Sequence, residues 1–114
     1  MSKELEDRFH EFGRRVRDFC RILKWDLINT EYLKQLIKAS GSVGANYIEA
    51  SDDLGKADEK MKIKLARREA KESKHWLRLI ITYDDSILEK ERAYLIDEAE
   101  QIKKILSTIV NKLR

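Results

Sequence analysis

Residues 57–83 read ADEKMKIKLARREAKESKHWLRLIITY, and this run carries two apolar lines at helical spacing. At about 100° per residue, the two lines lie about 150° apart around one long helix. The first line is Met61, Leu65, Trp76, Leu79 and Tyr83, and the second is Ile63, Ala66, Ala70, Leu77 and Ile81. A helix with two apolar sides needs neighbours on both, which predicts a helical bundle and, beyond it, a contact between subunits.

Three further helical periods complete the chain, with short connections between them. The predicted helices span about 4–24, 31–51, 57–83 and 89–113. Asn29 or Thr30 would cap the second helix, and Ser86 to Glu89 fits a capping box, although the fourth helix could also start near Glu91. The first helix has one narrow apolar stripe made of Leu5, Phe9, Phe12, Val16, Phe19, Cys20 and Leu23. The pattern predicts a single all-α domain over residues 1–114, an antiparallel up-down four-helix bundle.

The composition excludes several other classes of protein. Among 114 residues there is no proline and there are four glycines, too few for the turns of a sandwich or a barrel. The longest apolar run, residues 79–81, is far shorter than a membrane span needs, and the charged N-terminus lacks a signal-peptide core. Cys20 is the one cysteine, so a disulfide within the chain or a cysteine-based zinc site cannot form. These features lead us to expect a cytoplasmic protein.

The second helix has an unusual run of small residues at 39–45, ASGSVGA. Gly41 and Gly44 each cost about 1 kcal/mol of helix propensity. Such a cost is tolerated where another backbone comes close, so the run predicts tight packing against a neighbour. The alternative is a kink or a break near Gly41.

Charge is segregated on the third helix. Residues 56–78 hold nine basic and four acidic residues, a net +5, whereas the whole chain has a net charge of +3. Six of these cations fall on one side of the helix that has no acidic residue. We call them the basic strip: Lys60, Lys64, Arg67, Lys71, Lys74 and Arg78. At a rise of 1.5 Å per residue the strip is about 27 Å long. Like charges along one helix face repel, so the strip predicts an anionic partner, with RNA or DNA the first choice. The strip contains no aromatic residue, which favours electrostatic binding without sequence preference. An acidic protein surface, or a merely solvated basic face, would explain it too.

Two carboxylates, Glu69 and Glu72, point toward the apolar side of the same helix. Buried carboxylates need partners, and we interpret this pair as part of a structural polar network in preference to catalytic acids. Glu72 to His75 also matches the Glu-x-x-His unit of di-iron bundles, but the second unit is only Asp7 to His10, with aspartate in place of glutamate. We therefore predict no metal, no cofactor and no catalytic residue.

Two segments resemble a known family. Residues 42–50, SVGANYIEA, and residues 64–77, KLARREAKESKHWL, resemble the signatures of small bacterial four-helix bundle proteins encoded within 23S rRNA intervening sequences. The similarity runs from about Phe12 to Leu113. This sequence differs from many of the relatives in one respect. They have a proline between the first two helices, and this chain has none.

The resemblance implies a homopentameric barrel of up-down bundles. Relatives include the accessory protein of diversity-generating retroelements, a basic pentamer that works with a reverse transcriptase and binds nucleic acid. The family offers no catalytic residues. We interpret the positions that match the family signatures as structural. Four of them form the predicted polar network, Asn46, Glu49, Glu69 and Glu72, and the others are Gly44, Ala50, Trp76 and Leu77. We therefore expect a non-enzymatic ring that binds nucleic acid, as accessory to a reverse transcriptase or an RNA-processing partner, or alternatively a scaffold for an acidic protein.

Overall fold

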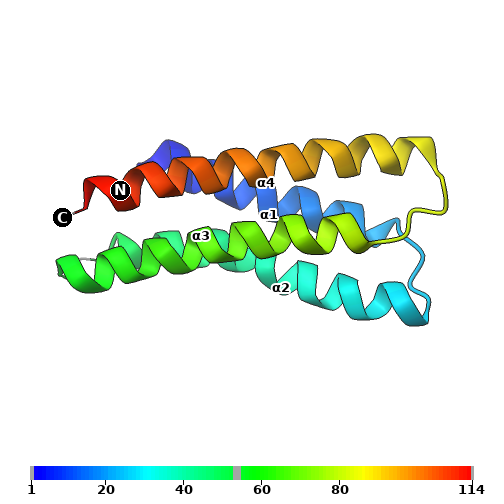
Figure 1. Cartoon of the computed structure of the whole chain (residues 1–114), viewed down its shortest axis with the longest axis horizontal. Helices are drawn as coiled ribbons and strands as arrows, with labels where there is room; N and C mark the ends of the chain where they lie inside the picture. Colours follow the sequence, from blue (N-terminus) through cyan, green and yellow to red (C-terminus); the bar gives the residue numbers. More distant parts are fainter. Residues whose placement is uncertain (1, 53–54, 114) are drawn as a thin grey trace.

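Four antiparallel α-helices make up the fold. The computed structural model of the chain describes residues 2–52 and 55–113. The helices are α1 (Lys3–Arg21), α2 (Leu27–Ala50), α3 (Lys56–Leu79) and α4 (Ser86–Lys112). The α1–α2 and α3–α4 connections lie at one end of the bundle, and both ends of the chain lie at the other (Figure 1). The predicted all-α four-helix bundle is confirmed.

The second helix begins at Leu27, four residues before the predicted start. Asp26 is its N-cap, because the Asp26 carboxylate accepts a hydrogen bond of 2.8 Å from the backbone N–H of Asn29. Asn29 and Thr30, the caps predicted from the sequence, therefore lie inside the helix. The helix runs on through Gly41 to Ala50, so it is not broken at the glycine.

The connection between α3 and α4 also differs from the prediction. α3 ends at Leu79 instead of residue 83, because Ile80 leaves the helix with extended backbone and Tyr83 and Asp84 adopt positive φ values. α4 begins at Ser86, three residues before the predicted start. Its cap is Asp85, whose carboxylate accepts from the N–H groups of Ile87 and Leu88 at 2.9 and 3.0 Å. Ser86 is therefore the first residue of the helix and not its capping residue.

Gly55 precedes α3 with φ +88° and ψ 160°. The sequence DDLG at 52–55 predicts a turn with Gly55 in the left-handed helical region. The positive φ agrees with that prediction, but the ψ value lies outside the left-handed helical region. The rest of that predicted turn, at residues 53 and 54, lies outside the described residues.

The core follows the apolar stripes of all four helices. The α1 stripe is buried from Phe9 to Leu23, and Leu5 packs against its edge. α3 contributes a single buried line of Ile63, Ala66, Ala70, Ser73 and Leu77. The first apolar line of α3 also has a partner within the chain, because Trp76 stacks on Tyr32 of α2 with 5.9 Å between ring centroids. The subunit contact predicted from two apolar lines is therefore explained in part by α2.

The small residues of α2 face α1. A Cβ added at Gly44 would lie 3.7 Å from the backbone of Phe9 and His10, and one at Gly13 would lie 3.5 Å from Ser40 O. The predicted close approach is thus found at Gly44. At Gly41 an added Cβ meets nothing within 4 Å, so no neighbour within the described chain requires that glycine.

Candidate nucleic-acid interface

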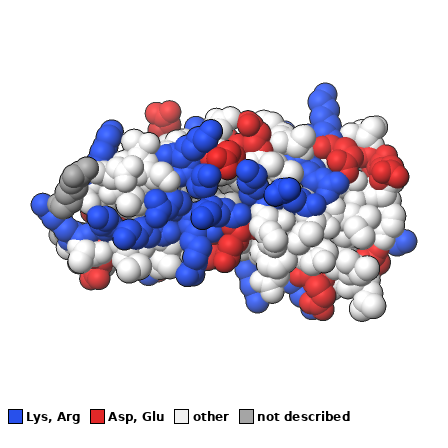
Figure 2. Space-filling model, viewed as in Figure 1, with Lys and Arg blue, Asp and Glu red and all other residues white. Residues whose placement is uncertain are grey.

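The basic strip lies along the groove between α3 and α4. Lys64, Arg67, Lys71, Lys74 and Arg78 each directly follow a buried residue of α3, which places them at the edge of the packed face beside α4. Lys60, Lys64 and Arg67 border one hollow of about 410 Å³ together with Val110 and Asn111. Figure 2 shows a band of lysine and arginine atoms following α3 across this face, with acidic atoms bordering it near the middle of the molecule.

The second half of the strip borders a smaller hollow. Lys71, Lys74 and Arg78 line this space of about 240 Å³, and α4 contributes Glu100 and Lys103. Glu100 is an acidic residue of α4 that lies beside the strip and cannot be recognised from the sequence of α3 alone. Its carboxylate lies 2.9 Å from Lys103 Nζ and 3.2 Å from Lys74 Nζ, and hydrogen bonds from these two ammonium groups hold the pKa of Glu100 below its ordinary value.

Few acidic side chains neutralise the remaining cations of the strip. Arg67 Nη1 donates to Ser107 Oγ at 3.5 Å. Lys74 is the strip cation with an ion pair to another described residue, and Lys60, Lys64, Lys71 and Arg78 have none within residues 2–52 and 55–113. Their charges are therefore available to an anion from outside the chain.

The four residues predicted as a polar network have separate partners. Asn46 Nδ2 donates to Ser42 O on its own helix, and Glu49 pairs with Lys62 Nζ at 2.7 Å. Glu69 lies 3.7 Å from Arg68 Nη2, and its side chain is 16% exposed. Burial, followed by the charge of Glu72, raises the pKa of Glu69 above its ordinary value. The carboxylates of α3 interact with each other, whereas Asn46 and Glu49 each bond elsewhere.

The two units considered for a di-metal site lie on different faces. His10 borders the groove between α1 and α2, whereas Glu72 and His75 border a hollow between α2 and α3. Within the part of the chain that the structure describes, no three His, Cys, Asp or Glu side chains gather closely enough to hold a metal ion.

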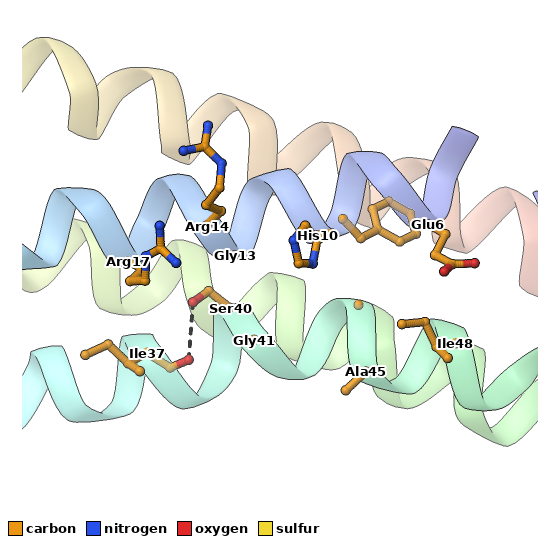
Figure 3. A pocket seen from close by; sticks show the side chains of 12 residues that line it. Glu6, His10, Gly13, Arg14, Arg17, Ile37, Ser40, Gly41, Ala45 and Ile48 are labelled. Atoms are coloured by element: carbon orange, nitrogen blue, oxygen red, sulfur yellow. Dashed lines mark hydrogen bonds between the residues drawn. The ribbon is translucent and has the colours of Figure 1, made fainter. Parts of the chain in front are cut away.

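A largely apolar groove of about 490 Å³ lies between α1 and α2 (Figure 3). Gly13, Gly41 and Gly44 border it at the closest approach of the two helices, and Ile37 and Ile48, which are 42% and 47% exposed, flank it along α2. His10 and Arg17 point from α1 into the gap, whereas Arg14 points away from it (Figure 3). The apolar period of the second helix predicts Ile37 on the main face of that helix with Leu33 and Leu36, which are buried, but the structure leaves Ile37 exposed.

A second apolar surface lies at the end that carries the α1–α2 and α3–α4 connections. Large exposed apolar side chains from both connections and the adjoining turns gather there: Ile22, Trp25, Leu27, Ile28, Leu79, Ile81, Tyr83 and Ile87. Exposed apolar clusters of this kind are typical of protein contact surfaces. None of the helices described is both long enough and apolar enough to cross a membrane.

Comparison with known proteins identifies a family and a similar solved structure. The model of a family described as 23S rRNA-intervening sequence protein matches residues 7–108. Among solved structures, the chain is similar to a protein of unknown function from the S23 ribosomal protein family of Bacteroides thetaiotaomicron VPI-5482, determined at 1.70 Å resolution. The two share 27% sequence identity with a TM-score of 0.80, over 92% of this chain and 96% of that one. No curated protein matches the chain.

Proposed function

The chain belongs to the 23S rRNA-intervening sequence protein family, and from this starting point we propose that it is a non-enzymatic, ring-forming protein that binds RNA or DNA through the basic strip. Binding is electrostatic and independent of sequence. In this role the protein assists a reverse transcriptase or an RNA-processing partner in the cytoplasm. It needs no cofactor.

The observation that carries the proposal is the set of unneutralised cations beside the α3–α4 groove. Five of the six strip cations have no ion pair to another described residue, and they follow one helix face over about 27 Å. Opposite charges three or four residues apart would stabilise the helix, yet this face has like charges at that spacing. A row of phosphates would offset the repulsion and release counterions on binding.

Charge reversal tests the nucleic-acid proposal. We expect Lys64→Glu with Lys71→Glu to weaken binding of a short RNA or DNA at least tenfold, because both side chains are exposed and have no partner to lose among the described residues. The slope of log K against log salt should fall in magnitude by about 0.7 to 0.9 for each phosphate contact removed. The matched control is Lys34→Glu with Lys38→Glu, which changes the net charge equally on the exposed side of α2. Equal binding by both double variants would refute the role of the strip.

We further propose that the chain assembles as a homopentamer, as the family resemblance implies. The groove between α1 and α2 supports a subunit contact, because Ile37 and Ile48 remain exposed and Gly41 meets no neighbour within the described chain. Five chains at +3 each would bring about +15 into one ring and raise the affinity of each strip for a long polyanion.

Light-scattering mass tests the assembly. We expect five times the mass of 13.5 kDa for the wild type and a smaller mass for Ile37→Glu, since a buried unpaired charge opposes association. Thr108→Glu introduces the same charge on the exposed side of α4, outside the groove, and serves as the control. A monomeric wild type would exclude the ring, and a pentameric Ile37→Glu would exclude this groove as its contact.

A scaffold for an acidic protein is the second candidate function. The exposed apolar side chains at the connection end favour a protein contact, since they would add apolar contact area to the charge of the strip. A partner that stays bound after nuclease treatment, is released at high salt and is lost with the Lys64 and Lys71 reversals would favour this function over nucleic-acid binding.

A further inference from the structure

A hollow between α2 and α3 brings aromatic rings next to the basic strip. Its volume is about 430 Å³, and its lining includes His75, Trp76, Arg68 and Glu72. The Trp76 indole stacks on Tyr32 at an interplanar angle of 29°, and the His75 ring meets the indole edge-on at a centroid distance of 4.8 Å. His75 and Trp76 directly follow Lys74 in the sequence, but only the packing of α2 on α3 shows that Tyr32 joins them.

Two residues connect the hollow to the strip. Lys71 and His75 line the hollow between α2 and α3 and also the space between α3 and α4. They therefore form a ridge on α3 between the two spaces. When the phosphates of a nucleic-acid strand contact Lys71 and Lys74 in the space between α3 and α4, its bases can reach across the ridge into the hollow between α2 and α3.

The chemistry of the hollow suits a base better than a phosphate. Glu72 and the cations Arg68 and Lys71 line it, and Glu69 on the same helix lies 3.7 Å from Arg68, so the carboxylates offset the positive charge there. A neutral base needs no net charge at its site, and its amino groups can donate hydrogen bonds to Glu72. The His75 and Trp76 rings offer a surface on which any base can stack.

We propose that the hollow lined by Trp76, His75 and Glu72 receives an unpaired base of a single-stranded RNA or DNA whose phosphates lie along the basic strip. The inference rests on the proposed nucleic-acid function and adds a ligand class to it. A duplex keeps the faces of its bases stacked inside, so it can contact the strip and not the hollow. Stacking does not depend on which base is present, which is compatible with binding that is independent of sequence.

Tryptophan fluorescence tests the inference directly. The chain has two tryptophans, so Trp25→Phe leaves Trp76 as the reporter. We expect an RNA or DNA single strand of about ten nucleotides to quench Trp76. An abasic oligonucleotide with the same phosphates, or a duplex, should bind without quenching. Trp76→Phe retains Trp25 at the connection end and is the control that should show no response.

His75→Ala supplies the second readout. The His75 side chain is exposed, so its removal is not expected to unfold the bundle, which circular dichroism can check. We expect the variant to lose about fivefold to a hundredfold in affinity for the single strand and nothing for the abasic strand, since stacking contributes that much per base.

The outcomes separate the two proposals. If single strands bind and Lys64 and Lys71 reversal weakens them, but Trp76 is not quenched and His75→Ala binds normally, then the strip is right and the hollow is wrong. If no nucleic acid binds, both the proposed function and the base site are wrong.

Discussion

The side-chain amide of Asn29 pairs with the backbone of Ile81. Asn29 Nδ2 donates to Ile81 O at 2.8 Å, and Ile81 N donates to Asn29 Oδ1 at 2.9 Å. The same Nδ2 also donates to Lys24 O at 2.9 Å, and Asn29 is fully buried. One side chain therefore holds the α1–α2 connection, the first turn of α2 and the α3–α4 connection together.

We expect Asn29→Ala to lower the free energy of unfolding by about 3 kcal/mol, because it removes three hydrogen bonds of a fully buried amide and leaves the part-buried backbone groups of Lys24 and Ile81 without these partners. Urea unfolding followed by circular dichroism would measure the change. Thr30→Ala, one residue away, is the control and should cost less than 1 kcal/mol. Equal losses in the two variants would contradict a special role for the amide.

Gly55→Ala should destabilise the bundle by about 1–3 kcal/mol. The residue before α3 has φ +88° and ψ 160°, a region that is open almost exclusively to glycine. There is room for the methyl group, since nothing lies within 4 Å of the added Cβ, so the cost comes from the backbone conformation. An unchanged urea midpoint would show that α3 can start with another backbone conformation.

Glu69→Gln should stabilise the protein at pH 7. The pKa of Glu69 is raised in the folded state by burial and by Glu72, so the charged form is penalised on folding. The folded state then binds the proton more tightly than the unfolded state. The free energy of unfolding of the wild type therefore rises as pH falls from the raised pKa to the ordinary value near 4.3.

Unfolding curves between pH 4 and pH 7 would test this prediction. The gain from Glu69→Gln should shrink toward pH 4, where the wild-type carboxyl is protonated. A variant less stable than the wild type at pH 7 would show that the contact with Arg68 outweighs the cost of burial.

Arg8 and Glu98 should show measurable coupling between α1 and α4. The guanidinium donates two hydrogen bonds to the carboxylate, at 2.9 and 2.8 Å, and the side chains are 35% and 15% exposed. A double-mutant cycle with alanine is expected to give about 1 kcal/mol at low salt and less at 1 M salt. The exposed pair Lys3 and Asp7 is the control, with less than about 0.5 kcal/mol expected.

Cys20 should be unreactive in the folded protein. Burial raises the pKa of its thiol to about 12, so the thiolate is scarce at pH 8. A thiol reagent such as Ellman's reagent should modify it at least a hundredfold more slowly in buffer than in denaturant. Comparable rates in the two solutions would mean that α1 opens readily.

Much of the fold could be predicted from the sequence because each helix carries its own apolar period. The α1 stripe from Phe9 to Leu23 shows this, since every residue assigned to it is buried or packs at its edge. The helix starts were harder to predict because several acceptable caps stand close together. Asp26 caps α2 while Asn29 bonds to Ile81, a contact that exists only once distant parts of the chain have packed.

The candidate site was predicted less completely, since a groove is made by two helices. The cations of the strip can be read from α3, but the position of Glu100 beside Lys74 depends on the register of α4. The presence of two apolar lines on α3 was interpreted as a sign of a subunit contact, whereas Trp76, on the first line, has Tyr32 of the same chain as its neighbour. Spacing along one helix cannot distinguish these two neighbours.

The pairing of Asn29 with Ile81 also bears on how long the folded bundle lasts. The two residues are 52 positions apart, so their hydrogen bonds can form only after α2 and α3 have docked along most of their length. Contacts that form after the transition state slow unfolding and leave the folding rate nearly unchanged. We therefore expect the buried amide of Asn29 to slow unfolding of the assembled bundle, so that its main effect is a longer lifetime of the native state.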